Sequence, residues 1–114
     1  MTTETTEPIA ENGVSAQRGS YMAALSLAEQ ILSKSSTLPT NLDVTVHPWA
    51  PKQPELRFYF HRDVPSLRQF RDDQMLTESM VTRENGSVYI EAVREDVRGV
   101  RVVAWTLTDA AVTA

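Results

Sequence analysis

An Asn85-Gly86 pair between two strand-like segments limits the possible folds of this chain more than any other feature. Asn-Gly favours the positive φ angles of a two-residue turn, and such a turn joins neighbouring antiparallel strands. The flanking segments, 78–84 and 87–94, contain β-branched residues and no proline. We therefore predict a hairpin in which Glu84 and Ser87 are neighbours. Its cross-strand pairs would be Val81–Ile90, Arg83–Val88 and Ser79–Ala92 on one face, and Thr82–Tyr89 and Met80–Glu91 on the other.

Apolar and polar residues alternate in segments 43–48 and 55–61, which predicts a second hairpin. The proline-rich stretch 49–54 would form its loop. Pairing Val46 with Phe58 would place the apolar residues of both segments on one face, because side chains alternate along a strand. The predicted pairs are Val46–Phe58 and Val44–Phe60 on that face, and Asp43–His61, Thr45–Tyr59 and His47–Arg57 on the other.

Two amphipathic helices are predicted. The first begins at Ser20, a residue type that caps helices, and ends before Pro39. Its inward side chains recur at helical spacing and are Tyr21, Ala24, Leu25, Ala28, Ile31 and Leu32. Asp63 would cap the second helix, which ends near residue 75 and directs Leu67 and Phe70 inward.

The resulting order of helix, strand, strand, helix and three strands predicts an α+β fold. In a two-layer sandwich, both helices would pack on one face of a mostly antiparallel sheet of up to five strands and so bury their apolar sides. Hairpin neighbours are expected to pair, and the remaining strand order stays open.

Residues 1–19 contain only two large apolar side chains, Ile9 and Val14, and predict a flexible N-terminal arm. Residues 20–107 would form a single α+β domain, and residues 108–114 a flexible C-terminal tail. No apolar run approaches the roughly 20 residues of a membrane helix, so no membrane is expected as a partner. The absence of cysteine and of a signal-like N-terminus is typical of a cytoplasmic protein.

The net charge of -4 is concentrated near the ends of the chain. Residues 20–107 carry ten of the 11 basic and eleven of the 15 acidic residues, a difference of only -1. A strongly basic nucleic-acid binder and an acidic mimic of DNA both require a large field of one sign. The charge pattern therefore excludes both classes.

The sequence predicts no catalytic residues, no metal site and no cofactor. His47, His61 and Asp63 are the one set that resembles a metal or acid–base site. In the predicted register the two histidines lie roughly 13 Å apart, too far to share an ion. The four glycines are scattered and form neither a phosphate-binding loop nor a dinucleotide fingerprint.

The sheet face that the helices leave uncovered is the predicted site of function. The last strand has two possible orientations: either Val100, Val102 and Ala104 face the core and Trp105 faces outward, or the reverse. With Trp105 outward, the candidate partner-binding residues are Tyr59, Tyr89, Trp105, His61 and Arg57. We interpret the protein as a non-enzymatic binding or regulatory module that binds itself or another protein, with a homodimer formed through this face or through a free edge strand.

Two alternatives from other classes remain. A nucleic-acid-binding accessory protein would use an arginine-rich edge composed of Arg57, Arg62, Arg68 and Arg71; the near-neutral charge does not favour it. A small-ligand-binding protein or enzyme would need His61 and Asp63 at the mouth of a pocket beside Tyr59.

Three short segments, Val46-His-Pro-Trp49, Arg57-Phe-Tyr-Phe-His-Arg-Asp63 and Val103-Ala-Trp-Thr-Leu107, carry a resemblance. Over roughly 20–107 the chain resembles small proteins of actinobacteria and of their phages or plasmids. The resemblance implies no activity and no functional residues.

Overall fold

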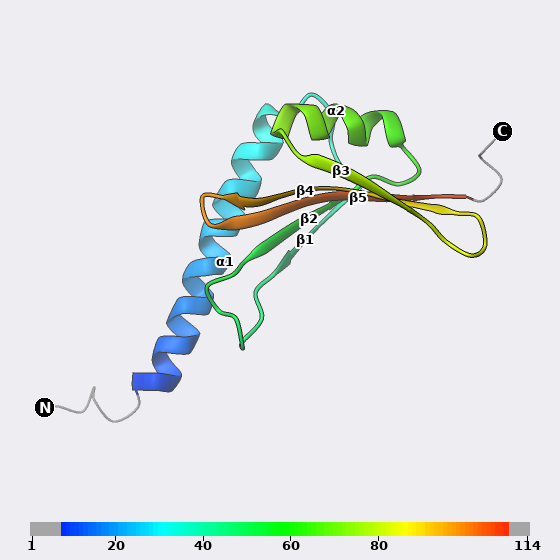
Figure 1. The fold of residues 1–114 in the computed structure, drawn as a ribbon. Helices are drawn as coiled ribbons and strands as arrows, with labels where there is room; N and C mark the ends of the chain where they lie inside the picture. Colours follow the sequence, from blue (N-terminus) through cyan, green and yellow to red (C-terminus); the bar gives the residue numbers. More distant parts are fainter. Residues whose placement is uncertain (1–7, 110–114) are drawn as a thin grey trace, which may run out of the picture.

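Both helices of the protein lie on one side of a five-stranded sheet, as the computed structural model shows for residues 8–109 (Figure 1). The predicted α+β two-layer sandwich is thereby confirmed. The elements, in chain order, are α1 (Pro8–Lys34), β1 (Asn41–Thr45), β2 (Glu55–Tyr59), α2 (Val64–Gln74), β3 (Thr77–Thr82), β4 (Val88–Val97) and β5 (Val100–Thr108).

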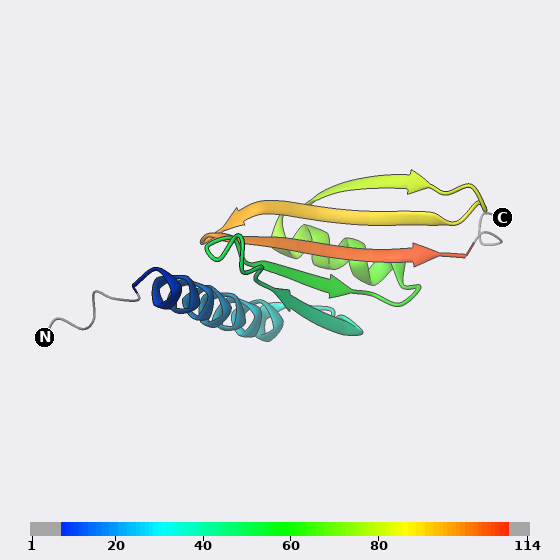
Figure 2. The same cartoon turned by 90° about the horizontal axis from the view of Figure 1, so that it is seen from below.

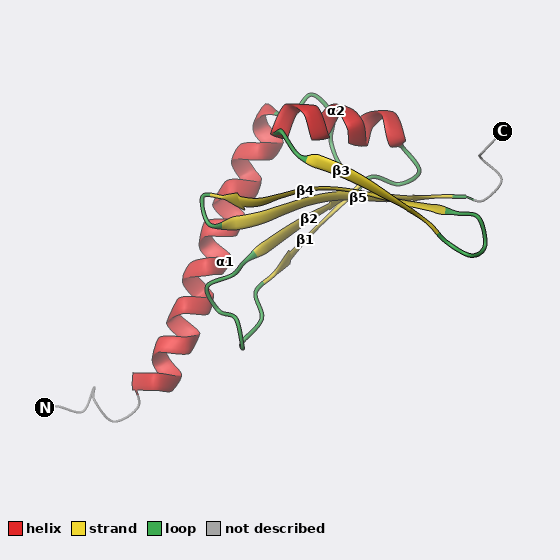
Figure 3. Cartoon of the chain, in the orientation of Figure 1, coloured by secondary structure: helices red, strands yellow, loops and turns green. Residues whose placement is uncertain are grey.

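The strand order across the sheet is β1-β2-β5-β4-β3 (Figure 2). Hairpin neighbours pair antiparallel, and the one parallel pair joins β2 to β5 in the middle of the sheet. Because of this pairing, the sheet is mixed, and segments distant in sequence meet at its centre. The β1–β2 connection and the β4–β5 turn lie at one end of the sheet, and the β3–β4 turn lies at the other (Figure 3).

One hydrophobic core lies between the sheet and the helices. From α2, Leu67 and Phe70 are fully buried, and the Phe70 ring lies 4.9 Å from that of Phe58 and 5.2 Å from that of Phe60. The inward side chains of α1 are Ala24, Leu27, Ala28 and Ile31. Leu25 was predicted to face inward, but it is 47% exposed, because the buried stripe follows residues 24, 27, 28 and 31 and leaves position 25 on the flank.

Helix α1 begins at Pro8 rather than at Ser20, so the prediction of a flexible arm is wrong for residues 8–19. Its first half contains Gly13 and Gly19, each of which disfavours a helix by about 1 kcal/mol relative to alanine. Contacts with the β1–β2 connection offset this cost: Gln17 Nε2 donates to the Val46 carbonyl at 2.8 Å, and Ser20 Oγ donates to the Pro51 carbonyl at 2.5 Å.

The predicted C-terminal tail also begins too early, because Thr108 belongs to β5 and its hydroxyl accepts the Val88 amide. Residues 1–7 and 110–114, the rest of the predicted arm and tail, lie outside the described residues. Within residues 8–109, neither helix combines the length and apolar character needed to cross a bilayer.

The β1–β2 register differs from the prediction by four residues. Val44 pairs with Leu56 rather than with Phe60, and the predicted pairs Val46–Phe58, Asp43–His61, Thr45–Tyr59 and His47–Arg57 do not form. The connection is longer than expected, since β1 ends at Thr45 and turns follow at His47–Ala50 and Ala50–Gln53. An even shift keeps each side chain on its predicted face, so the inner and outer sets are unchanged.

The β3–β4 register differs by one residue, which exchanges the two faces of β3. Met80 lies opposite Ile90 and Val81 opposite Tyr89. Met80 and Thr82 therefore do not lie on the face that the helices leave uncovered, where the predicted register placed them beside Tyr89. Gly86 has a φ of 88°, whereas Asn85 does not have a positive φ. The Gly86 amide donates to the Arg83 carbonyl and the Arg83 amide to the Ser87 carbonyl, so the loop has three residues instead of two.

Candidate binding face of the sheet

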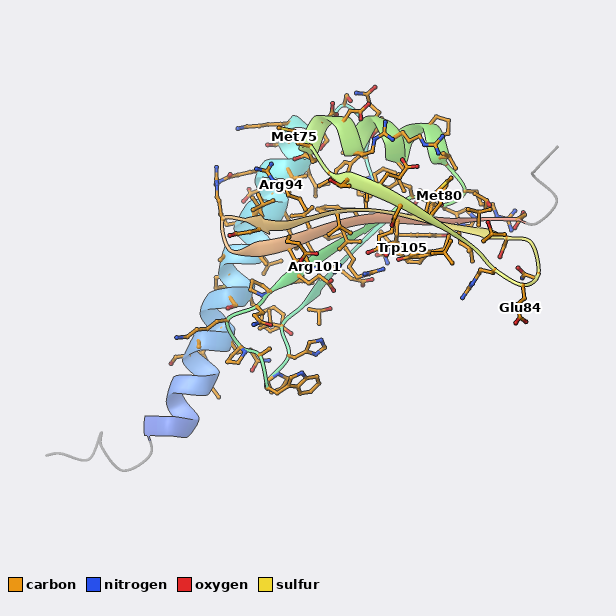
Figure 4. The ribbon with its side chains drawn as sticks, in the orientation of Figure 1. Met75, Met80, Glu84, Arg94, Arg101 and Trp105 are labelled. Carbon is orange, nitrogen blue, oxygen red and sulfur yellow. The ribbon has the colours of Figure 1, made fainter. Side chains whose placement is uncertain are left out.

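The face of the sheet opposite the helices presents an aromatic cluster of Tyr59, Trp105 and Tyr89. The parallel pairing of β2 with β5 places Tyr59 directly beside Trp105, with ring centroids 4.4 Å apart. Tyr89, from β4, lies 5.9 Å from Trp105 on the other side. Of the two orientations possible for the last strand, the structure therefore has the one in which Trp105 faces away from the core (Figure 4). The cluster is half-buried rather than fully exposed.

Arg57, on β2, stabilises this cluster because it contacts both Trp105 and Tyr89. Its guanidinium lies 5.6 Å from the centroid of Trp105 and donates to the Tyr89 hydroxyl at 3.0 Å. Burial raises the pKa of Tyr89, and the Arg57 hydrogen bond acts in the opposite direction. Tyr89 therefore remains a neutral phenol at physiological pH. The side chains of the cluster are ordered by one another, which lowers the entropy cost of binding a partner.

Next to the aromatic cluster, Arg101 binds three carboxylates. It hydrogen-bonds to Glu55 on β2 and, at 3.0 Å, to Glu95 on β4; Glu91 lies 3.7 Å away. The hydrogen bond and charge of Glu55, followed by the charge of Glu95, outweigh burial and raise the pKa of Arg101. Figure 4 shows Arg101 and Trp105 on the same side of the sheet, away from α2.

The charges on the strands of this face do not balance. Two guanidiniums, those of Arg57 and Arg101, stand against four carboxylates, those of Asp43, Glu55, Glu91 and Glu95. The difference is -2, and Glu95 keeps 75% of its side chain exposed. The aromatic cluster is thus bordered by carboxylates on the side toward the β4–β5 turn, where Glu55 and Glu95 lie beside Arg101. We call this surface, with the aromatic cluster at its centre, the open face.

Two of the polar groups predicted to share one site are separated. His61 lies at the border of the open face, where its Nδ1 is 2.7 Å from the Tyr59 hydroxyl. Asp63 instead caps α2, since its carboxylate accepts the Ser66 amide at 3.1 Å. The side chain of Ser66, followed by its amide, lowers the pKa of Asp63. Both residues are exposed. His61 is therefore available to a partner that covers the open face, whereas Asp63 is occupied in a helix cap.

The four arginines of the predicted nucleic-acid edge also lie apart. Arg57 is on the open face, whereas Arg68 and Arg71 extend from α2 and hydrogen-bond to Glu78 at 3.0 Å and 2.6 Å. Arg62 forms a 3.1 Å ion pair with Asp109. Each guanidinium has a carboxylate near it, and the four do not form one continuous basic edge.

Sequence reasoning missed the cluster of Arg101 with Glu55, Glu91 and Glu95. The cluster exists because β5 lies between β2 and β4, and that order was not predicted. Beside it, a cleft of about 350 Å³ is bounded by the β1–β2 connection and the β4–β5 turn. His47 lines this cleft and stacks on Trp49, with ring centroids 4.5 Å apart.

Comparisons with protein-family models, with curated proteins and with solved structures found no match. Among the residues that the structure describes, no three His, Cys, Asp or Glu side chains come close enough together to hold a metal ion.

Proposed function

We propose that this protein is a non-enzymatic binding module whose open face binds a protein partner with a basic and apolar surface. The observation that supports the proposal best is the aromatic cluster bordered by excess carboxylates. Tyrosine, tryptophan and arginine contribute most of the binding energy at many protein interfaces, and here all three types occur at the centre of one face.

The charge of the open face favours a basic partner over nucleic acid or a second open face. The strands of the open face carry two more carboxylates than guanidiniums, and this excess disfavours both phosphates and a second open face. Lysine or arginine side chains of a partner would meet Glu91, Glu95 and Asp43, while its apolar side chains cover Trp105 and the two tyrosines. His61, at the border, would contact the same partner.

The proposal can be tested with two synthetic peptides on the full chain. One alternates lysine and leucine, the other glutamate and leucine, so that they have the same apolar pattern and opposite charge. We expect the lysine peptide to shift the amide resonances of β2, β4 and β5 and to change the fluorescence of Trp105 in a Trp49→Phe background. The glutamate peptide should do neither.

Matched variants test whether the lysine peptide binds at the open face. Glu91→Gln together with Glu95→Gln should weaken binding of the lysine peptide by about tenfold, because two charge contacts are lost. Glu84→Gln, in the exposed β3–β4 turn (Figure 4), should leave it unchanged. Equal binding of both peptides, or shifts confined to other elements, would refute the proposal. Binding of an oligonucleotide that Arg57→Gln and Arg62→Gln abolish would favour the nucleic-acid alternative instead.

A further inference from the structure

A second surface suited to binding lies on α1, on the flank turned away from the core. Val14, Met22 and Leu25 are 53%, 60% and 47% exposed there. Arg18 and Glu29 are exposed on the same flank, and at its end Leu32 is partly exposed while it also packs against the core. These residues follow one another at spacings of four, four, three, four and three, which places them along one stripe of the helix. We call them the α1 stripe.

The α1 stripe has a symmetric order. Met22 and Leu25 occupy its middle, Arg18 precedes them by four residues, and Glu29 follows them by four. Val14 and Leu32 stand at the two ends. If a second copy of the helix is laid antiparallel on the first, with a two-fold axis between residues 23 and 24, Met22 meets Leu25 of the other copy. Arg18 then meets Glu29, and Val14 lies one residue out of register with Leu32.

We infer that α1 forms a homodimer through this stripe, as an antiparallel helix pair between two copies of the chain. A two-fold interface must be complementary to itself, and the order of apolar, basic and acidic residues satisfies that condition. The stripe extends over roughly 27 Å, long enough for two apolar contacts at the centre and an ion pair on each side. Because the charges are complementary to themselves, we assign this surface to a second copy of the chain.

The arrangement of the fold leaves the stripe accessible. Helix α1 lies along the β1 side of the molecule, and its N-terminal part extends beyond the strands (Figure 2). Its buried residues, Ala24, Leu27 and Ile31, point to the sheet from another side of the helix. The inferred dimer therefore does not use the open face, which stays available to the partner proposed above. Each proposal can fail without the other.

The test is a charge exchange, followed by sedimentation equilibrium of the full chain over a range of concentrations. We expect the wild type to dimerise reversibly. Arg18→Glu should weaken the dimer by about tenfold or more, because two attractive pairs become repulsive. Glu29→Arg should do the same by the converse change. Trp105→Ala, on the open face, serves as the control and should leave dimerisation unchanged.

Mixing the two single variants gives the decisive result. In an antiparallel pair of one Arg18→Glu chain and one Glu29→Arg chain, the two substituted positions meet on one side and carry opposite charges. The unaltered Glu29 and Arg18 meet on the other side, so the mixture should dimerise as the wild type does. The double variant Arg18→Glu with Glu29→Arg should also dimerise.

Three outcomes would overturn the inference: a monomeric wild type, single variants that dimerise normally, or a mixture that stays monomeric. Because recovery in the mixture requires folded chains, it also excludes misfolding as the cause of any loss in the single variants.

Discussion

The aromatic side chains on the two faces of the sheet differ in their burial and in their polar contacts. On the helix side, Phe58, Phe60 and Phe70 are fully buried, and the ring of Phe70 packs against those of Phe58 and Phe60. On the open face, Tyr59, Trp105 and Tyr89 remain half-buried, and both tyrosine hydroxyls lie within hydrogen-bond distance of a charged or titratable side chain. The aromatic residues on the helix side therefore stabilise the fold, whereas those on the open face remain partly exposed and able to contact a partner.

The two charged clusters differ in the same sense. Glu78 on β3 is bound by Arg68 and Arg71, which anchors α2 to the edge of the sheet. Arg101 on the open face is surrounded by three carboxylates, more than one guanidinium can neutralise. The first cluster fastens neighbouring elements together, whereas the second leaves negative charge at the surface for a partner.

The largest expected effect is on the free energy of unfolding, and it distinguishes two neighbouring residues of β2 that face opposite sides of the sheet. Phe58→Ala should lower the free energy of unfolding by about 3–5 kcal/mol, because it empties a fully buried site. Tyr59→Ala should lower it by only about 1–2 kcal/mol, through loss of the Trp105 contact. Urea unfolding measures both values. Tyr59→Phe, which keeps the ring, is the control, and equal losses for Phe58→Ala and Tyr59→Ala would contradict the distinction.

The Glu78 cluster should make stability depend on pH. The Arg68 hydrogen bond lowers the pKa of Glu78 below its ordinary value of 4.5, burial opposes this, and Arg71 adds to it. A carboxyl whose folded pKa is lowered stabilises fully above its unfolded pKa and loses that contribution as the pH falls through the folded value. Glu78→Gln should therefore cost about 1–2 kcal/mol at pH 7 and progressively less below pH 4.5.

Thermal unfolding at several pH values checks this prediction. Glu84→Gln, in the exposed turn, should change stability little at any pH. A penalty for Glu78→Gln that is constant from pH 7 to about pH 3 would show that the charge on Glu78 does not stabilise the fold.

A smaller effect is expected at Thr106, the inward neighbour of Trp105. Its hydroxyl is buried without a hydrogen-bond partner among the described residues. Thr106→Val should raise the free energy of unfolding by about 1 kcal/mol, because an unsatisfied polar atom leaves the core. Thr108→Val is the matched control and should be destabilising, since the Thr108 hydroxyl accepts the Val88 amide at 3.2 Å. Chemical denaturation that ranks the two variants in the reverse order would contradict both expectations.

The sequence predicted more of the fold than of the candidate site. The faces of β1 and β2 were correct although the register was wrong, because a shift by an even number of residues keeps each side chain on its side. The same reasoning failed at β3, where one extra loop residue exchanged the faces. Asn85-Gly86 correctly marked a hairpin, but the loop conformation decided which residues paired.

Helix α1 illustrates a second limit. Capping chemistry placed its start at Ser20, and residues 1–19 contain too few large apolar side chains to predict an ordered element. The helix in fact begins at Pro8, and Gln17 and Ser20 in its first half bind carbonyls of the β1–β2 connection, contacts between residues 29 and 31 positions apart. The α1 stripe was missed for the same reason, since part of it lies in the segment that was predicted to be flexible.

Local patterns alone determined the α+β class, the two helices, the hairpins and the inner faces of β1 and β2, because periodicity and turn chemistry act over a few residues. Only the tertiary structure decided that β5 lies between β2 and β4. That order brings Tyr59 to Trp105 and Glu55 to Arg101, pairs 46 residues apart in the chain. No local rule relates such distant positions, since the free energy that selects their pairing comes from the burial of the whole sheet against the helices.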